Sequence, residues 1–588
     1  MEVVEGIFTA FRRHRRIALL IACSLALSGI LFLPLFWGVP KGFDLPIHLS
    51  ILDQFSKEIH EGNLFPAWLG QFNGGLGDPT MVFYPPGLYY LGSLFSTALG
   101  WDTVCGLFGA LFLLTAVSFV GMFFLVRPVG GTGGGLLAMA CLLLIPFRAF
   151  VIHGAGMYPA YGAGCILPFA LLALWRLSTA EKGSSFFHPA CLGWACSLAM
   201  ITLLNLPFAV LLLHVVILWA IVEVGISRDP GFLIRLGVGT LWGLLLAAFY
   251  LVPMIENLPF IRPPFFGIAV YQQNFPLAMP PEIFGSRVTT LISRIFLFSL
   301  LGLFVSIAIL RAVPSPSQGQ PAVKEDVKSW VRTHLVFAMG AFFLLSPAAR
   351  WLWDALPLLQ KVNLPWRLLD HAAVPAAALQ ALAFTIVWKK IRLRPRRWIL
   401  IALLSLASAG LCGNLASKIA SASGIVSRGW LMGMLSNFLV MKGDYLPIWA
   451  AREGECGEGH NVRVLEGEAK GKIRHWGGSN REIEIEVASS AILAIHTFDY
   501  PGWEAEFQRG EEKIILPIEK DVPCGRMMVS VPEGSGVLRL RFGRPMGWRA
   551  GALASGVALI SLGLWAVLRP GKSRNRQRPP RPLGPAHP

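Results

Sequence analysis

Ionisable side chains gather in one stretch of this chain, residues 42–91, where carboxylates and imidazoles recur every few positions. The stretch reads GFDLPIHLSILDQFSKEIHEGNLFPAWLGQFNGGLGDPTMVFYPPGLYYL and contains Asp44, His48, Asp53, Glu58, His60, Glu61 and Asp78. Only 14% of all residues are charged, so this concentration stands out. A carboxylate can take a proton from an attacking hydroxyl group as a general base, and an imidazole one helical turn away can orient it. The pair Asp44 and His48 therefore indicates acid–base or binding chemistry in this stretch.

The rest of the chain is apolar. Of its 588 residues 54% are hydrophobic, and the mean hydropathy is +0.58, which excludes an ordinary soluble enzyme. Long runs such as GALFLLTAVSFVGMFFLV lack the alternation of a barrel strand, and about 20 such residues cross a bilayer as a helix. The sequence predicts a polytopic α-helical membrane protein.

The positive charge lies beside the apolar runs. The net charge is +17, and its clusters are Arg12, Arg13, Arg15 and Arg16, then Lys389, Lys390, Arg392, Arg394, Arg396 and Arg397, then Arg569, Lys572, Arg574, Arg576, Arg578 and Arg581. This placement is typical of cytoplasmic anchors that touch anionic lipid, and it argues against nucleic-acid binding. Both termini are therefore expected in the cytoplasm, with the protein in the cytoplasmic (inner) membrane.

About twelve spans follow from this topology. They are expected near 17–36, 104–126, 132–148, 158–175, 187–204, 206–223, 234–255, 289–311, 334–350, 371–388, 397–413 and 550–568. The segment 85–99 is interpreted as a helix that lies in the membrane interface or dips into the membrane, because a further span there would place residues 389–397 outside. The Gly-rich segment 130–135 is expected to be a cytoplasmic turn.

The chain divides into four expected parts. Residues 1–413 form the multi-span region, with a first external loop at 37–103, and residues 549–569 form a last span before a basic cytoplasmic tail at 570–588. Residues 414–548 lie outside and alternate in hydropathy between turn residues, as in REIEIEVASSAILAIHTF, which predicts a small β-sandwich. Cys456 and Cys524 fall inside this external region, where an oxidising compartment favours a disulfide between them.

Four segments carry a family resemblance. They are residues 43–91, HGAGMYPAYGAGCILPFALLAL, LLQKVNLPWRLLDHA and FDYPGWEAEF. The first resembles the first external loop of the bacterial membrane family labelled 6-pyruvoyl-tetrahydropterin synthase-related, through its D-x-P-x-H, G-x-x-x-P-x-W and F-Y-P-P patterns. That loop is similar to the first loop of GT-C glycosyltransferases. The resemblance implies transfer of a sugar from a polyprenyl phosphate carrier to a glycan, lipid or protein acceptor at the outer membrane face.

Such a reaction needs a base near the membrane surface, and Asp44 is the first candidate. A second role is open, because Asp followed closely by Pro is a usual helix start. His48 would orient Asp44 or contact phosphate. A divalent metal at this pair is left open as the weaker interpretation, and no cofactor is identified. Asp78 is either a second carboxylate of the site or the start of a turn.

The remaining acidic groups and tyrosines of the stretch have a simpler interpretation. Asp53, Glu58, His60 and Glu61 are expected on the wet face of an interfacial helix. Tyr84, Tyr89 and Tyr90 suit the lipid headgroup belt, with stacking on a sugar or prenyl chain as the alternative.

Substrate-binding candidates come from the other predicted outer loops. Arg148, His153, Glu256, Arg262, Trp366 and Arg367 form this set. Arg367, in NLPWR, is the preferred phosphate ligand because it lies outside against the positive-inside trend. Arg148 would bind phosphate or extend to headgroups, and Glu256 would be a second acid or the ion-pair partner of Arg262.

Two other function classes compete with a glycosyltransferase. A transporter or flippase of lipid-linked material would place ionisable residues within its spans and show inverted repeats, and the predicted spans here are nearly free of charge. A non-catalytic envelope assembly protein would only display its external β domain.

Overall fold

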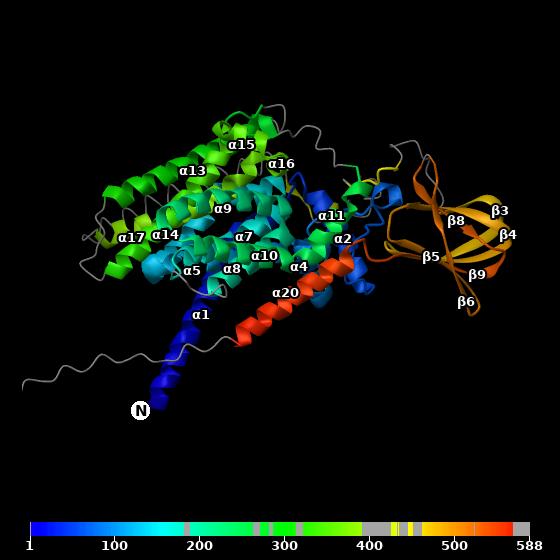
Figure 1. Cartoon of the computed structure of the whole chain (residues 1–588), viewed down its shortest axis with the longest axis horizontal. Coiled ribbons are helices and arrows are strands. Elements are labelled where there is room, and N and C mark those ends of the chain that lie inside the picture. Colours follow the sequence, from blue (N-terminus) through cyan, green and yellow to red (C-terminus); the bar gives the residue numbers. More distant parts are fainter. Residues whose placement is uncertain are drawn as a thin grey trace, which may run out of the picture.

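The computed structural model describes residues 2–181, 188–262, 271–280, 286–312, 321–390, 425–427, 429–431, 433, 445–450, 461–522 and 524–568. Most helices form one body, and an antiparallel β domain lies at one end of it (Figure 1). Helices α2 (Leu45–His60) and α11 (Ala248–Asn257) lie between the two parts. The predicted class, a helical membrane protein with a C-terminal β domain, is confirmed.

The other helices vary widely in length. Their bounds are α1 Glu2–Phe32, α3 Thr80–Phe83, α4 Gly87–Leu99, α5 Thr103–Leu143, α6 Pro146–Phe150, α7 Tyr158–Ser178, α8 Pro189–Leu204, α9 Leu206–Ser227, α10 Pro230–Leu246, α13 Ser286–Ala312, α14 Pro321–Leu345, α15 Arg350–Ala355, α16 Pro357–Gln360, α17 Leu369–Lys390 and α20 Trp548–Leu568. A π-helical turn, η3 (Val151–Ala155), follows α6, and a 3-10 turn, η7 (Pro365–Leu368), precedes α17.

Seven helices within the described residues are long and apolar enough to cross a membrane, and up to nine if each of two bent pairs is one span. The bent pairs are α10 with α11, at 73°, and α14 with the short helices after it, at 81°. The chain is therefore a multi-pass membrane protein. The predicted number of about twelve spans stays a prediction, because the expected span at 397–413 lies outside the described residues.

Helix α5 is a helical hairpin rather than a straight rod. Gly131 adopts φ 72° and ψ −174°, which breaks the helix in the predicted glycine-rich turn. A Cβ atom added to Gly135 would lie 2.7 Å from the ring of Phe123, so the two arms pack side by side. The arms match the two spans predicted at 104–126 and 132–148, although the seven candidates count α5 once.

The segment predicted to lie in the interface forms α4, a helix of 13 residues. At about 1.5 Å per residue it is too short to cross the roughly 30 Å hydrocarbon core. Its Gly92 packs against Leu52 of α2, where an added Cβ would lie 2.8 Å from the leucine side chain. Helix α4 thus supports α2 from the side.

The β domain is a seven-stranded antiparallel sheet. Its strands are β3 Val462–Trp476, β4 Asn480–Phe498, β5 Trp503–Arg509, β6 Glu512–Leu516, β7 Ile518–Lys520, β8 Arg526–Val531 and β9 Gly534–Phe542. The order is β6-β5-β9-β4-β8-β7, and β3 pairs with β4. Strand β4 is the centre: its first half pairs with β9 from Asn480 opposite Arg541, and its second half pairs with β8 from Ala491 opposite Val531.

The first external loop and the β domain share one hydrophobic core. Trp68 is fully buried and packs against Trp503 and Phe542, with ring centroids 5.5 and 5.3 Å apart. The backbone is joined as well, because Phe498 N–H donates to the carbonyl of Leu76 at 2.9 Å. The β domain is therefore packed onto the loop over a continuous apolar surface.

One surface prediction for α2 is wrong. Glu58 is 4% exposed and faces the β domain, where its carboxylate accepts a hydrogen bond from the backbone N–H of Ser479 at 3.0 Å. The sequence predicts Glu58 on the wet face of this helix with Asp53, His60 and Glu61, but it does not reveal that another domain covers the last turn. Asp53 does follow the expectation: it forms an exposed ion pair with Lys57 at 2.6 Å.

Cys524 is disulfide-bonded. Its predicted partner, Cys456, lies outside the described residues, so the pairing stays a prediction. Six cysteines elsewhere are free: Cys23, Cys105, Cys141, Cys165, Cys191 and Cys196.

The α5 hairpin predicts on which side of the membrane two positions lie. Its first arm, Thr103 to Gly130, is about 40 Å long and crosses the bilayer, so Thr132 and the β domain must lie on opposite sides. A membrane-impermeant maleimide should label Glu511→Cys in intact cells and Thr132→Cys only after permeabilisation. The unmodified chain gives the background from its own cysteines. Labelling of both positions from one side would show that this arm does not cross.

Candidate active site

Asp44 lies directly before α2, at the position of its N-cap. Its φ of −97° and ψ of 1° are not those of a usual cap, and its carboxylate makes no capping hydrogen bond. The main chain is instead fixed from the other side, because Asp44 N–H donates to the carbonyl of Ala155 at 3.3 Å. Asp44 therefore starts the helix by position, while its carboxylate does not serve the helix end.

A contact between two glycines brings Asp44 to this place. A Cβ atom on Gly42 would lie 2.9 Å from the Cα of Gly156, and one on Gly156 would lie 3.1 Å from Asp44 N. Gly156 also has a φ of +72°, which few other residues adopt. The loop before α2 and the end of η3 can approach this closely only because both positions lack a side chain.

Groups from distant segments face Asp44. Tyr89 of α4, Tyr158 in the first turn of α7 and Arg367 of η7 all interact with it electrostatically. Tyr84 also acts on Tyr89 and Arg367. We call these five residues the Asp44 cluster. It joins two predicted site residues, Asp44 and Arg367, that are more than 300 residues apart in the sequence.

His48 lies one turn into α2 and is buried beneath the Asp44 cluster. Its Nδ1 is 2.8 Å from the hydroxyl of Tyr89, and its ring lies 5.5 Å from that of Tyr158. Burial lowers the pKa of His48 to about 3, so its imidazole is neutral at physiological pH. Burial likewise raises the pKa of Tyr89 well above its usual value, so the phenol keeps its proton. His48 therefore holds Tyr89 in place as a neutral hydrogen-bond partner.

Arg367 has one buried donor without a hydrogen-bond partner in the described part of the chain. Its Nη1 donates to the carbonyl of Val362 at 3.4 Å, whereas its buried Nε has no hydrogen-bond partner among the described residues. The buried hydroxyl of Tyr158 is in the same condition. Donors left unmatched in a buried place cost free energy unless another group accepts from them. An anionic or hydroxyl-bearing ligand would supply that acceptor.

Trp366 anchors the turn that carries Arg367. It is 3% exposed and packs edge-to-face against Phe147 and Phe150, at centroid distances of 6.2 and 6.3 Å. The expected substrate-binding residue is thus part of the packing between η7 and α6, and its neighbour Arg367 faces the cluster.

Arg148 and His153 lie inside the helix packing. Arg148 is 3% exposed; it lies 2.9 Å from Cys165 Sγ, lies over the ring of Tyr161 at 4.8 Å, and interacts with the carboxylate of Asp370. The guanidinium of Arg148 therefore interacts with groups of the helix bundle. In the described part of the chain no contact joins Arg148 to the Asp44 cluster. Phosphate binding by Arg148 therefore stays a prediction.

His153 belongs to η3 and contacts the first span. Its Nε2 lies 2.9 Å from the carbonyl of Leu31, and its ring meets Phe32 edge-on at 6.4 Å. Burial lowers the pKa of His153 to about 4, which keeps the ring neutral. It fixes η3, and with it Gly156, against α1.

Asp78 is fully buried in a turn of the first loop. Its carboxylate accepts from Thr80 N–H at 3.0 Å and from Asn73 Nδ2 at 3.4 Å, and its backbone pairs with Leu69 in both directions. These contacts favour the turn interpretation over the second carboxylate.

Glu256 and Arg262 do not form the expected ion pair within the described residues. Glu256 is exposed on α11, whereas Arg262 donates to the carbonyls of Ile448, at 3.1 Å, and Ala450, at 2.5 Å. Arg262 thereby joins the loop after α11 to the segment that leads into the β domain.

Sequence reasoning missed one residue that acts on the cluster. Tyr445 interacts electrostatically with Arg367 and Tyr89, and its ring stacks on Phe83 with centroids 5.2 Å apart. No motif or periodic pattern marks Tyr445 in the sequence. The sequence predicts a headgroup role for the tyrosines of FYPPGLYY, but Tyr89 is fully buried, which excludes that role for it.

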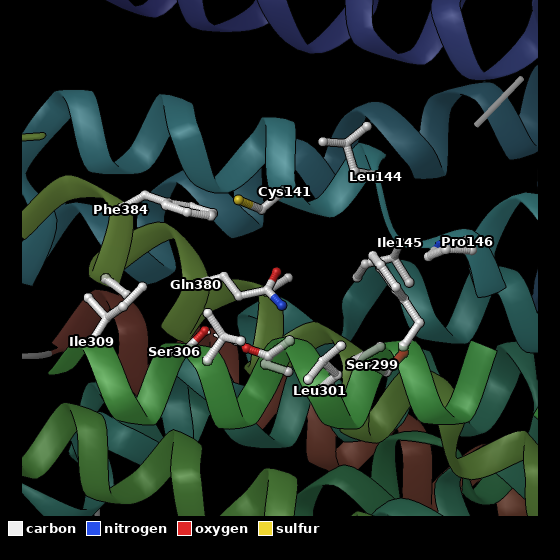
Figure 2. Close-up of a pocket in the computed structure, with 17 residues that line it drawn as sticks. Cys141, Leu144, Ile145, Pro146, Ser299, Leu301, Ser306, Ile309, Gln380 and Phe384 are labelled. Carbon is white, nitrogen blue, oxygen red and sulfur yellow. Dashed lines mark hydrogen bonds between the residues drawn. The ribbon is translucent and has the colours of Figure 1, made fainter. Parts of the chain in front are cut away.

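A pocket of about 370 Å³ lies within the spans, between the second arm of α5, α13 and α17. Figure 2 shows the Gln380 amide inside it, with Cys141 on one wall and Leu301 and Ser306 on the opposite wall. The rest of the lining is almost wholly apolar. Its end at Ile145 and Pro146 adjoins Phe147, which packs on Trp366. Among residues of the described chain, no group of three His, Cys, Asp or Glu side chains could hold a metal ion.

Several solved structures are similar to this chain at low identity. The crystal structure of ArnT from Cupriavidus metallidurans bound to undecaprenyl phosphate is 17% identical, with a TM-score of 0.43 over 72% of this chain and 70% of that one. The archaeal oligosaccharyltransferase AglB from Archaeoglobus fulgidus, in complex with an inhibitory peptide and a dolichol-phosphate, is 14% identical, with a TM-score of 0.41 over 74% of this chain and 60% of that one.

Arabinofuranosyltransferase AftD from Mycobacteria is 16% identical, with a TM-score of 0.41 over 74% of this chain and 28% of that one. TM-scores below 0.5 do not assign a fold or an activity to this chain. No family model and no curated protein matches it, so the resemblance to the family labelled 6-pyruvoyl-tetrahydropterin synthase-related stays a prediction.

The glycine contact gives a test of how tightly Asp44 is held. Gly156→Ala should lower the free energy of unfolding by about 1 kcal/mol through its positive φ and by a further 1 to 3 kcal/mol or so through crowding of Asp44 N. Gly62→Ala is the matched control, because Gly62 has a φ of +87° and nothing within 4 Å of the added Cβ. Chemical unfolding in detergent measures both. Equal losses of unfolding free energy in the two variants would mean that the loop before α2 moves away from the added methyl group at no cost.

Proposed function

We propose that this protein is an integral-membrane glycosyltransferase that takes a sugar from a polyprenyl phosphate carrier and transfers it to an acceptor outside the cytoplasmic membrane. One observation carries the proposal: the carboxylate of Asp44 and the guanidinium of Arg367 interact electrostatically beside the membrane spans, both half-buried and next to the buried Tyr89 and Tyr158. A base and a cation are the two groups that this transfer needs. The resemblance of the first loop to GT-C glycosyltransferases points the same way.

Asp44 would act as the general base. An acceptor hydroxyl attacks the anomeric carbon of the donor sugar, its oxygen forms the new glycosidic bond, and its proton passes to the Asp44 carboxylate. At the same time the bond from the anomeric carbon to the phosphate oxygen breaks, and the carrier phosphate leaves with the electron pair. Asp44 suits this role because its carboxylate is not used to cap α2.

Arg367 would hold the carrier phosphate and stabilise the charge that grows on it as it leaves. A guanidinium can donate two parallel hydrogen bonds to a phosphate, and such bonds are stronger where water is excluded. The buried Nε of Arg367 has no other partner among the residues described, and the Tyr158 hydroxyl lies unmatched in the same cluster. Together they would present two donors to the substrate.

The apolar pocket between α5, α13 and α17 would take part of the prenyl chain. It lies among the spans, its lining is mostly apolar, and it adjoins the residues that pack on Trp366. The lipid and the reacting phosphate would thus be bound by neighbouring parts of one bundle.

The proposal includes the topology expected from the basic clusters. Both termini lie in the cytoplasm, the β domain lies in the periplasm or an equivalent external space, and the parts are 1–413, 414–548, 549–569 and 570–588. The sugar donor, membrane lipids and a glycan, lipid or protein acceptor are the partners.

Asp44→Asn separates a base from a structural residue. The amide keeps the size of the carboxylate but cannot take a proton, so turnover should fall by roughly 100-fold or more. Turnover is measured as carrier release from a panel of polyprenyl-phosphate-linked sugars by the purified protein in nanodiscs. Asp53→Asn, on the same helix and paired with Lys57 at its surface, should keep the wild-type rate.

Wild-type turnover by a well-folded Asp44→Asn protein would remove Asp44 from the chemistry. If the unmodified protein releases no carrier from any donor of the panel but moves lipid-linked material between leaflets, the transporter hypothesis replaces the proposal.

Arg367→Ala tests the phosphate contact. Loss of a hydrogen bond to a charged group costs about 1.5 to 3 kcal/mol, so KM for the donor should rise by roughly tenfold to 100-fold. Arg367→Lys keeps the charge without the planar fork and should recover only part of the affinity. Arg350→Ala is the control, because Arg350 is exposed and lies 4.0 Å from Asp354. An unchanged KM in Arg367→Ala would place the phosphate elsewhere.

A further inference from the structure

The last turn of α2 is bound to the β domain through a buried carboxylate. Glu58 Oε1 accepts from the backbone N–H of Ser479 at 3.0 Å, and Oε2 accepts from the Ser479 hydroxyl and from Asn63 Nδ2, the latter at 3.0 Å. Gly478 lies so close that an added Cβ would be 2.5 Å from Glu58 Oε1. This carboxylate therefore satisfies the turn between β3 and β4 as well as its own loop.

A buried cation lies on the β-domain side of the same contact. Arg481 of β4 is 0% exposed, and its Cζ lies 4.7 Å from the ring centre of Trp476 and 4.8 Å from that of Trp503. None of its three guanidinium nitrogens has a hydrogen-bond partner among the described residues. The carboxylate of Glu58 interacts electrostatically with this guanidinium.

Each charge depends on the other. A guanidinium placed between two aromatic faces is attracted to them, but it has lost its water, and among the described residues Glu58 is the carboxylate that offsets that loss. If Glu58 loses its charge, Arg481 remains as a buried and uncompensated cation. Removing both charges would take away that penalty, so the two residues must be strongly coupled.

Helix α2 connects this contact to Asp44. Its 16 residues form a rod about 24 Å long, with Asp44 before its first residue and Glu58 in its last turn. The Asp44 end rests on Gly156 and the Glu58 end on Ser479. These two contacts fix the ends of a helix whose side packs on α4.

The geometry points to a positioning role for Glu58, Ser479 and Arg481: they form a latch through which the β domain holds α2, and thereby Asp44, against the Asp44 cluster. This inference rests on the proposed function only for its effect on transfer. The effect of the latch on α2 itself is independent of any activity.

Hydrogen exchange of the full-length protein in nanodiscs tests the latch without a substrate. Glu58→Gln keeps the side-chain shape and should speed exchange in residues 45–52 by about tenfold or more, because α2 opens more often. Glu58→Gln combined with Arg481→Met should exchange more slowly than Glu58→Gln alone. Ser479→Ala is a milder variant, and it should act on the same residues if Glu58→Gln does not fold. Glu484→Gln, which breaks the exposed Glu484–Arg474 pair of the same domain, should change nothing.

Transfer kinetics supply the second measurement. Because Arg367 is untouched, Glu58→Gln should lower kcat for carrier release and leave KM for the donor within about twofold. If no variant and no wild-type protein transfers sugar, the proposed function fails while the exchange result still stands. Unchanged exchange at 45–52 in folded Glu58→Gln or Ser479→Ala protein, or a double variant no slower than Glu58→Gln, would overturn the latch.

Discussion

Helix α2 is fixed at both of its ends, and the candidate site depends on that constraint. At one end Gly42, just before the helix, packs directly on Gly156 without room for a side chain. At the other end Glu58 is hydrogen-bonded to Ser479. The membrane spans hold η3 and η7 in place around the first end. The β domain, far along the chain, holds the second. The position of Asp44 is thus set jointly by the part of the protein in the membrane and by the part outside it.

Burial also decides the charge states in and around the site. Burial removes the water that would stabilise the charged form of either group. His48 therefore stays neutral, and Tyr89 keeps its proton. Asp44 and Arg367 are therefore the two groups of opposite charge in the Asp44 cluster, and they interact electrostatically. A charge that appears on a molecule bound beside the buried Tyr89 and Tyr158 is screened less than it would be in bulk water.

The sequence predicted the individual helices and strands better than the contacts between them. Apolar runs predicted the spans, alternation predicted the strands of the β domain, and the glycine-rich segment 130–135 predicted the turn within α5, which breaks at Gly131. Asp44 and Arg367 were each selected for their chemical type and their place beside a span. Periodicity describes one segment at a time, however, so it could not show that Glu58 faces Ser479 rather than water or that Arg148 faces Asp370. Tyr445 carried no local signal at all, because its role comes only from the segments that it approaches.

The core shared by the first loop and the β domain has a consequence for synthesis of the protein. Glu58 and Ser479 are 421 residues apart, and a ribosome adding about 5 to 20 residues per second needs roughly 20 to 80 s to cover that distance. During this interval Trp68 has already been made, whereas Trp503 and Phe542, which pack on it, have not. The loop must wait with its aromatic side chains uncovered, and exposed apolar surface of this kind favours aggregation. A chaperone outside the membrane, or the bilayer surface itself, would have to shelter the loop until the C-terminal strands arrive.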